Sequence, residues 1–348
     1  CAAGRGYLDR YDQAVAGKTM DELHTAADAW QHAFDAWNAS IAAARQADPG
    51  ITWDTLNEQY GACPWPPPVT PFSQWHTCGA FEAMIMRITP YTLEGVLWYQ
   101  GEEDEPYCES YRELLGLMIA EWRTLWHRAD LPFLLVQLPQ WIDRKVDEST
   151  GDPMLWPTIR AAQWDAAHGI DGVHAVCLMD CGEYDNIHPT DKRTPGERLA
   201  DCALRYVYGH AEMPVEGPEL LDAQVIDGTH MRLRFTHAHG LRFDGTDPSS
   251  RHNADLRSRE NTSTTVRNAG KSGFEIADAD GRFRGVAAEI IGTDTGQNHA
   301  DPTIGTVMLT APEKIQPVTV RYAWRSWGPA PLFNADALPA VPFTHHLA

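Results

Sequence analysis

The sequence predicts an α/β domain with a parallel sheet, followed by a region of antiparallel strands. Three apolar runs, at residues 96–99, 133–139 and 173–180, alternate with amphipathic helical patterns. The second run is almost continuously apolar, which is typical of a strand in a sheet that helices cover on both faces. From Met213 onward, short alternating segments are separated by Gly, Asp and Asn, and this pattern predicts a small antiparallel sheet or sandwich.

The first region begins with a segment, residues 1–18, that Gly4, Gly6 and Gly17 predict to be irregular, and it continues with a long helix. Thr19 and Glu22 have the spacing of a capping box, in which each side chain satisfies a free backbone amide of the other residue. Apolar residues then recur at intervals of three and four, so the helix should end near Gly50. The proline-rich segment 63–68 can be neither a regular helix nor a central strand, and we interpret it as a stiff connector.

The other helices of this region alternate with the three strands. Apolar residues at helical spacing predict helices over residues 79–94, 111–125 and 157–168. A last helix begins at Thr194, with proline at its first position, and Gly209 closes it. We therefore expect two domains, residues 1–211 and residues 212–348. Strands of the second domain are expected at residues 231–235, 306–309 and 318–324.

The composition is that of a globular protein, with 43% apolar and 22% charged residues. The net charge of −20 argues against a nucleic-acid partner, because phosphate contacts need clustered Lys and Arg, and it would also repel anionic membranes. No apolar run reaches the ~18 residues of a membrane-spanning helix. The charge is compatible with a neutral substrate, or with an acidic one held by a local arginine.

The seven cysteines form an odd set without a C-x-x-C pair, which favours free thiols and a cytoplasmic rather than a secreted protein. Cys177 and Cys181 are four residues apart but have no His or Cys partners at the spacing of a zinc site. The acidic run at 102–105 is typical of a solvated loop or of the negative start of a helix. We therefore expect neither a metal nor a cofactor.

Polar residues follow the first and third strands of the predicted sheet. Gln100, Gly101 and Glu102 come directly after the run at 96–99, where an open α/β sheet places its chemistry. Gln100 offers two donors and one acceptor, and Gly101 allows a turn or the close approach of a ligand. In isolation, this stretch also fits a core strand that ends in an ordinary polar turn.

Asp185 and His188 lie on the loop that leaves the third strand. A carboxylate three residues before an imidazole can fix the tautomer of the ring and stabilise the imidazolium, which leaves the other nitrogen free to accept a proton from a nucleophile. The alternative is a helix-start Asp beside an incidental surface His. Their position after a third parallel strand favours the catalytic interpretation.

A resemblance to a known family gives these residues roles. The ordered motifs GVLWYQGE, YRELLGLMIAEWRTLW, LPFLLVQLP, WPTIRAAQ and DNIHPTDKRTPGERLA, with a late VRYAW and LPAVPF, resemble the sialate O-acetylesterase family over about residues 75 to 343. That family consists of SGNH-type serine esterases with a three-layer α/β/α sheet and a β-sandwich portion. The resemblance implies that His188 is the general base and Asp185 its orienting carboxylate. It also implies that Gln100 lines the crevice and helps to hold the oxyanion, and that Glu102 positions Gln100 or the substrate.

The sequence departs from the family pattern at the nucleophile. Members of the family carry a G-Q-S-N-like or G-D-S-like turn and a G-G-T segment near the amino terminus, and none of the ten serines here stands in such a turn. We therefore expect that the α/β domain is truncated at its amino terminus, with the first strand and the nucleophile missing. The intact protein should remove O-acetyl groups from sugars, first of all sialic acids, whereas the chain by itself should be inactive.

Three alternatives remain open at this point. The protein could be an esterase for acetylxylan or another polysaccharide, or a non-catalytic module that binds carbohydrate. A metal-dependent hydrolase is a more distant possibility. In the first two cases the partner is a sugar rather than a nucleic acid or a membrane, and the sequence leaves the oligomeric state open.

Overall fold

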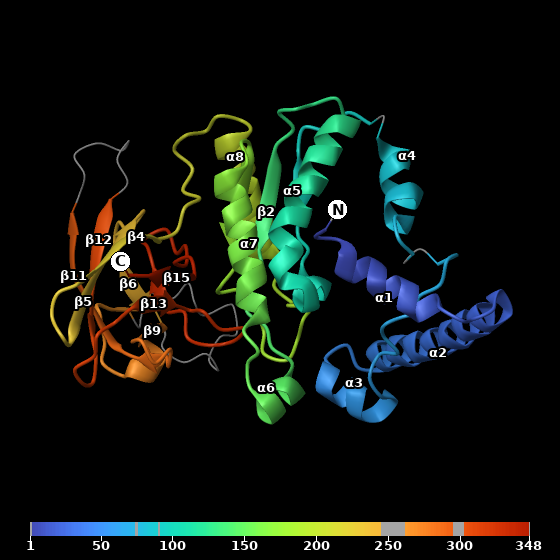
Figure 1. The fold of residues 1–348 in the computed structure, drawn as a ribbon, viewed down its shortest axis with the longest axis horizontal. Coiled ribbons are helices and arrows are strands. Elements are labelled where there is room, and N and C mark those ends of the chain that lie inside the picture. The colour runs from blue at the N-terminus through green and yellow to red at the C-terminus, as the bar shows by residue number, and fades with distance from the viewer. Residues whose placement is uncertain (1, 74–75, 90, 245–261, 295–302, 348) are drawn as a thin grey trace. The chain divides into compact units, whose positions relative to one another are not determined.

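A computed structural model describes residues 2–73, 76–89, 91–244, 262–294 and 303–347 (Figure 1). The chain forms two compact units, Cys1–Thr92 and Leu93–Ala348, which are described separately. The second unit holds both the parallel sheet and the antiparallel strands, so the proposed boundary between residues 211 and 212 stays a prediction.

The first unit is helical. Its elements are the α-helices α1 (Arg5–Val15), α2 (Met20–Ala47) and α3 (Trp53–Tyr60), a π-helical turn η1 (Phe81–Ile85) and the short α4 (Met86–Ile88). The capping box is confirmed, because the Glu22 amide donates to Thr19 Oγ1 over 3.3 Å and the Thr19 amide donates to Glu22 Oε2 over 2.8 Å. A small core forms where Ile41 and Ala44 of α2 meet Leu56 of α3.

Two expectations for this unit were wrong. The segment 1–18 is not irregular, because α1 occupies residues 5–15, where Tyr7, Tyr11 and Val15 recur every four residues and the glycines lie at the helix start. The helix expected over 79–94 is shorter, since the π-helical turn leads into α4, which already ends at Ile88.

The second unit begins with the predicted parallel sheet. Its strands are β1 (Val96–Trp98), β2 (Phe133–Gln137) and β3 (Val173–Cys177), in that order across the sheet. Leu97 pairs with Leu134, and Leu135 pairs with Ala175, both in parallel register. All three predicted strands are confirmed, and their carboxyl ends lie on one edge of the sheet.

Helices cover this sheet on both faces, as in a three-layer α/β/α fold. On one face, α5 (Cys108–Leu125) and α7 (Leu155–Gly169) pack side by side over Val96, Phe133 and Leu135 (Figure 1). On the other face, α8 (Arg193–Tyr206) packs over Leu134 and Val176. The connections include the 3₁₀ helix η2 (Glu102–Tyr107) and the short helix α6 (Arg144–Thr150).

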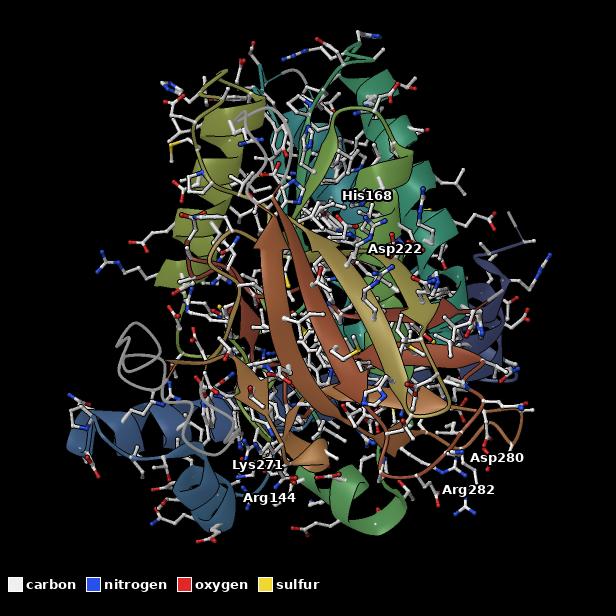
Figure 2. All side chains as sticks on the ribbon, turned by 90° about the vertical axis from the view of Figure 1, so that its left-hand side faces the viewer. Arg144, His168, Asp222, Lys271, Asp280 and Arg282 are labelled. Carbon is white, nitrogen blue, oxygen red and sulfur yellow. The ribbon has the colours of Figure 1, made fainter. Side chains whose placement is uncertain are left out.

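The rest of the second unit consists of antiparallel sheets, as predicted. Figure 2 faces the largest of them, with strand order β4-β5-β12-β11-β8. A second sheet has the order β10-β9-β13-β15 and a third the order β14-β6-β7. The elements are β4 (Glu219–Val225), β5 (His230–Thr236), β6 (Arg242–Asp244), β7 (Thr262–Ser263), β8 (Thr265–Val266), η5 (Ala269–Lys271), β9 (Phe274–Ala277), β10 (Arg284–Gly285), β11 (Ala287–Asp294), β12 (Ile304–Thr310), β13 (Thr319–Tyr322), β14 (Leu332–Phe333) and β15 (Phe343–His346).

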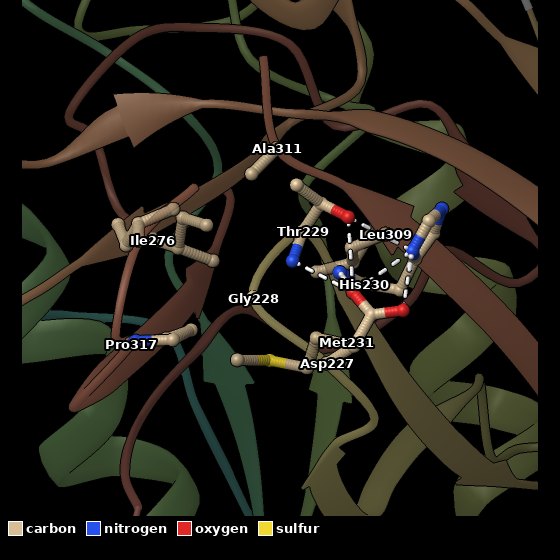
Figure 3. Close-up of a pocket in the computed structure, with 10 residues that line it drawn as sticks. Asp227, Gly228, Thr229, His230, Met231, Ile276, Leu309, Ala311 and Pro317 are labelled. Atoms are coloured by element: carbon tan, nitrogen blue, oxygen red, sulfur yellow. Dashed lines mark hydrogen bonds and ion pairs between the residues drawn. The ribbon is translucent and has the colours of Figure 1, made fainter. Parts of the chain in front are cut away.

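Aromatic side chains fill the core between these sheets. Phe235, Phe274 and Tyr322 are fully buried, and the ring centroids of the last two lie 4.6 Å apart. Beside this core lies a cavity of about 10 Å³, lined by Ile276 and Leu309 among others (Figure 3). A space of that size holds about one water molecule, which excludes a sugar.

Helix α7 is tied to the antiparallel region through a carboxylate on β4. Trp164 Nε1 donates to Glu219 Oε1 over 2.8 Å, and His168 Nε2 lies 3.4 Å from the same oxygen. The position of His168 is labelled in Figure 2. The hydrogen bond with Glu219 raises the pKa of His168 to about 9. Burial alone would raise the pKa of Glu219, but the bonds from His168 and Trp164 lower it.

This pair predicts a pH-dependent contribution to stability. The raised pKa of His168 means that the contribution is fully present below about pH 6.5 and is lost as the pH rises through about 9. Because the His168 side chain is 55% exposed, we expect His168→Gln to cost only ~0.5–1 kcal/mol near pH 6 and nothing near pH 10. Urea unfolding at both pH values measures the difference, and an equal cost at both would contradict the assignment.

Candidate active site

Gly101 shapes the turn at the end of β1. Its φ of +140° is a conformation that side chains rarely adopt. A Cβ atom there would lie 3.0 Å from Ile159 Cγ2 and 3.1 Å from Gln163 Nε2. The glycine therefore lets the strand end pack directly against α7, which fixes the positions of Gln100 and Glu102 on either side of it.

Gln100 is held from several directions. Its backbone carbonyl accepts from Gln163 Nε2 over 2.9 Å and from the Tyr111 hydroxyl over 3.0 Å. Its side-chain Nε2 donates to Asp104 Oδ2 over 2.6 Å, and its Oε1 lies 3.3 Å from the Tyr111 hydroxyl. The amide is therefore fixed before any substrate arrives. Sequence reasoning missed the role of Gln163, which is fully buried, although the residue belongs to the WPTIRAAQ motif.

His188 lies close enough to Glu102 to act on it electrostatically. Burial raises the pKa of Glu102, while the charges of His188 and Lys192 act in the opposite direction. Lys192 also places its ammonium 5.6 Å from the centre of the Tyr99 ring. Burial and the charge of Glu102 raise the pKa of that Tyr99 hydroxyl. The structure therefore brings residues after β1 and β3 together at the carboxyl edge of the sheet.

Asp185 is bound by a residue other than His188. Its backbone is left-handed, with φ of 60°, a conformation that Asp tolerates better than most residues. One carboxylate oxygen accepts from the Arg144 amide over 2.8 Å, and the other lies 3.2 Å from Arg144 Nε. Within the described residues no hydrogen bond joins Asp185 to His188, so the predicted pairing stays a prediction.

Glu183 organises the loop that carries His188. One oxygen of Glu183 accepts from both the amide and the hydroxyl of Thr190, each over 2.6 Å, and the other accepts from Asn186 Nδ2 over 2.6 Å. Asn186 Oδ1 in turn accepts from the His188 amide over 3.1 Å. The exposed imidazole of His188 therefore stands on a braced loop. Glu183 has no sequence signal beyond its place between the strand and His188.

A buried ion pair supports the start of the same loop. Arg198 on α8 binds Asp180 through two bonds, of 2.6 and 2.7 Å, and also donates to the Cys177 carbonyl over 2.8 Å. Burial opposes the charge of Arg198, but the carboxylate of Asp180 raises the pKa of the guanidinium. A cavity of about 340 Å³ borders this pair and several carboxylates, and Gln100, Glu102, Asp185 and His188 do not line it.

Other features bear on what the site could hold. In the part of the chain that the structure describes, no group of three His, Cys, Asp or Glu side chains is placed to bind a metal ion. Six described cysteines are free, and burial raises the pKa of Cys177 to about 12. No helix among the described residues combines the length and apolar character needed to span a membrane.

The parallel sheet with helices on both faces is that of an α/β protein with an SGNH-like fold, and comparison with known proteins makes the family specific. Residues 2–205 match the family described as carbohydrate esterase, sialic acid-specific acetylesterase. The chain belongs to this family, which confirms the resemblance drawn from its motifs.

Individual relatives agree with this assignment. The sialate O-acetylesterase of Homo sapiens is 26% identical over 285 residues, which cover 76% of this chain and 48% of the relative. The Mus musculus sialate O-acetylesterase is 28% identical over 155 residues, covering 40% of this chain and 28% of the relative. A crystal structure of a carbohydrate acetylesterase from Xanthomonas citri superposes with a TM-score of 0.58 at 29% identity, covering 76% of this chain and 53% of that one.

These relatives are longer than the matched chain. The chain spans about half the length of the human relative and of the bacterial esterase. The similarity covers the sheet, its helices and part of the antiparallel region. It does not by itself assign a reaction to the whole protein.

Proposed function

We propose that this protein takes part in removing O-acetyl groups from sugars, with sialic acids as the first candidate substrate and acetylxylan as the alternative. The observation that carries the proposal is that His188 lies close enough to Glu102 to act on it electrostatically, while the neighbouring amide of Gln100 is held fixed at the carboxyl edge of the sheet. Family membership supports the same chemistry.

In this proposal His188 is the general base. Its imidazole takes the proton of a serine hydroxyl while the oxygen attacks the acetyl carbonyl, and it then returns the proton to the departing sugar oxygen. Water next attacks the acyl-serine with the same base, and acetate leaves. The Gln100 amide stabilises the oxyanion, and Glu102 positions Gln100 or the substrate. For Asp185 to brace the ring, its carboxylate must accept from His188 in addition to Arg144.

A serine esterase needs a nucleophile as well as a base. None of the ten serines lies in the turn that the family uses, so we propose that the 348-residue chain binds acetylated sugars but does not turn them over. The test is hydrolysis of 4-nitrophenyl acetate by this chain and by its His188→Ala variant. We expect both to match the buffer rate within experimental error.

The result of this assay, and the same assay on a longer protein, decide whether a nucleophile is present and whether His188 acts as the base. If the unchanged chain hydrolyses the ester and His188→Ala does not, a nucleophile is present and the inactivity proposal is wrong. If a reading frame upstream supplies a G-D-S-like turn, the longer protein should be active, and His188→Ala should lower its kcat by about 10³-fold or more. Activity that survives this substitution would remove His188 from the mechanism.

A further inference from the structure

A loop from the antiparallel region, residues 325–328, lies against the candidate active site. Trp141, which follows β2, donates its amide to the Ser326 carbonyl over 3.0 Å. The next residue, Ile142, accepts from the Asp185 amide over 3.2 Å. The loops after β2 and β3 and the loop 325–328 therefore form one hydrogen-bonded group, although the last comes from far along the chain.

The backbone on both sides of Trp327 is pinned to the α/β region. The amide and the hydroxyl of Ser326 each donate to the Asp152 carboxylate over 2.7 Å. The Gly328 amide donates over 2.8 Å to Oε1 of Gln140, a residue that is 1% exposed. Arg160, fully buried on α7, donates to the Arg325 carbonyl. Trp327 therefore sits on a rigid support rather than on a mobile tip.

Trp327 forms an aromatic corner with Tyr184. The two rings meet edge to face, with centroids 5.8 Å apart and planes at 63°, and both side chains are half-buried. Tyr184 immediately precedes Asp185, and its hydroxyl donates to Asp147 over 3.0 Å. Among the described residues, none accepts a hydrogen bond from the indole N–H of Trp327. This N–H is not buried either, so a ligand can reach it.

This arrangement suits a sugar ring. The C–H groups on one face of a pyranose carry partial positive charge and lie favourably on the negative face of an aromatic ring. An indole N–H with no protein partner can donate to a sugar hydroxyl. Because the support is already ordered, binding has little loop entropy to overcome. An aromatic contact that served only the fold would need neither a free indole N–H nor hydrogen bonds that hold the backbone on both sides of Trp327.

We propose, building on the proposed function, that Trp327 and Tyr184 form the subsite that holds the sugar ring of the acetylated substrate. The antiparallel region then supplies a specificity-determining residue to the site of the α/β region. Trp327 contacts the sugar and not the ester, so it acts on substrate affinity rather than on the base at His188.

Calorimetric titration of the 348-residue chain with 9-O-acetyl-N-acetylneuraminic acid and, separately, with acetylated xylobiose tests this subsite. We expect Trp327→Ala to weaken the binding of the preferred sugar by about 10- to 100-fold, because it removes one aromatic wall. Trp327→Phe should retain affinity within about threefold, and Tyr184→Phe should do the same because it keeps the ring. The matched control is Tyr208→Ala, which removes a 60% exposed aromatic ring just after α8 and should change nothing.

The outcomes distinguish this subsite from the proposed function. If the unchanged chain binds neither sugar, the proposed function fails, and the subsite fails with it. If the unchanged chain binds one of them and a folded Trp327→Ala variant binds it equally well, only the subsite is overturned. Near-ultraviolet circular dichroism establishes that each variant is folded. Should Trp327→Ala not fold, loss of affinity in Tyr184→Ala with retention in Tyr184→Phe supports the subsite, and equal affinity in all three chains overturns it.

Discussion

Replacing Arg198 by alanine is expected to lower the free energy of unfolding by about 3–5 kcal/mol. Both side chains of the Asp180–Arg198 pair are only 11% exposed. Removal of the guanidinium would leave the Asp180 carboxylate buried without its counter-charge and would free the Cys177 carbonyl from a 2.8 Å bond. The cost is therefore mainly that of an uncompensated buried charge, which is larger than the net value of the pair itself.

Chemical unfolding monitored by circular dichroism measures this effect, and two further variants serve as comparisons. Arg193→Ala removes a guanidinium that is 81% exposed and paired with Glu197 on the same helix, so it should cost less than about 1 kcal/mol. The double variant Asp180→Leu with Arg198→Met removes both charges and should recover much of the lost stability. A single Arg198→Ala variant as stable as Arg193→Ala would show that the pair is not buried in solution.

Replacing Asp152 by alanine should cost about 2–4 kcal/mol, because its carboxylate accepts two 2.7 Å bonds from Ser326, a residue that is 2% exposed. The same change should loosen the backbone beside Trp327 and weaken sugar binding without touching the sugar. Urea unfolding gives the stability, and the emission of Trp327, isolated by difference against Trp327→Phe, reports the loosening.

Ser326→Ala is the matched control for this prediction. It removes only the hydroxyl bond and keeps the bond from the Ser326 amide to Asp152, so it should cost about 1 kcal/mol and leave the position of Trp327 unchanged. If Asp152→Ala were no more destabilising than Ser326→Ala, the carboxylate would not be the anchor of this loop.

Much of the fold could be predicted because its signals are local. The three parallel strands are apolar runs bounded by polar residues, and the capping box of α2 is a pattern of four residues. Three strands of the antiparallel region, β5, β12 and β13, followed from alternation in the same way, whereas its other strands were not predicted. The helix α1 was missed because glycines were taken as breakers, although glycines at a helix start interrupt little.

The site was only partly predictable, because its bonds join distant parts of the chain. The positions of Gln100 and His188 after strands predict them as site residues, but Asp152 and Ser326, which are bonded to each other, are 174 residues apart in sequence. The partner of Asp185 is Arg144, 41 residues upstream, whereas motif spacing alone pointed to His188. Side chains that meet through tertiary folding leave no periodic trace in the sequence, so these contacts needed the structure.

The bonding of residues 325–328 to the active-site loops has a consequence for synthesis of the protein. A ribosome translates His188 and Tyr184 well over a hundred codons before Trp327, so the nascent chain carries the proposed base long before it carries the indole that completes the aromatic corner. A premature stop codon anywhere between α8 and β13 would release a polypeptide that contains His188 but lacks Trp327, one wall of the proposed sugar subsite.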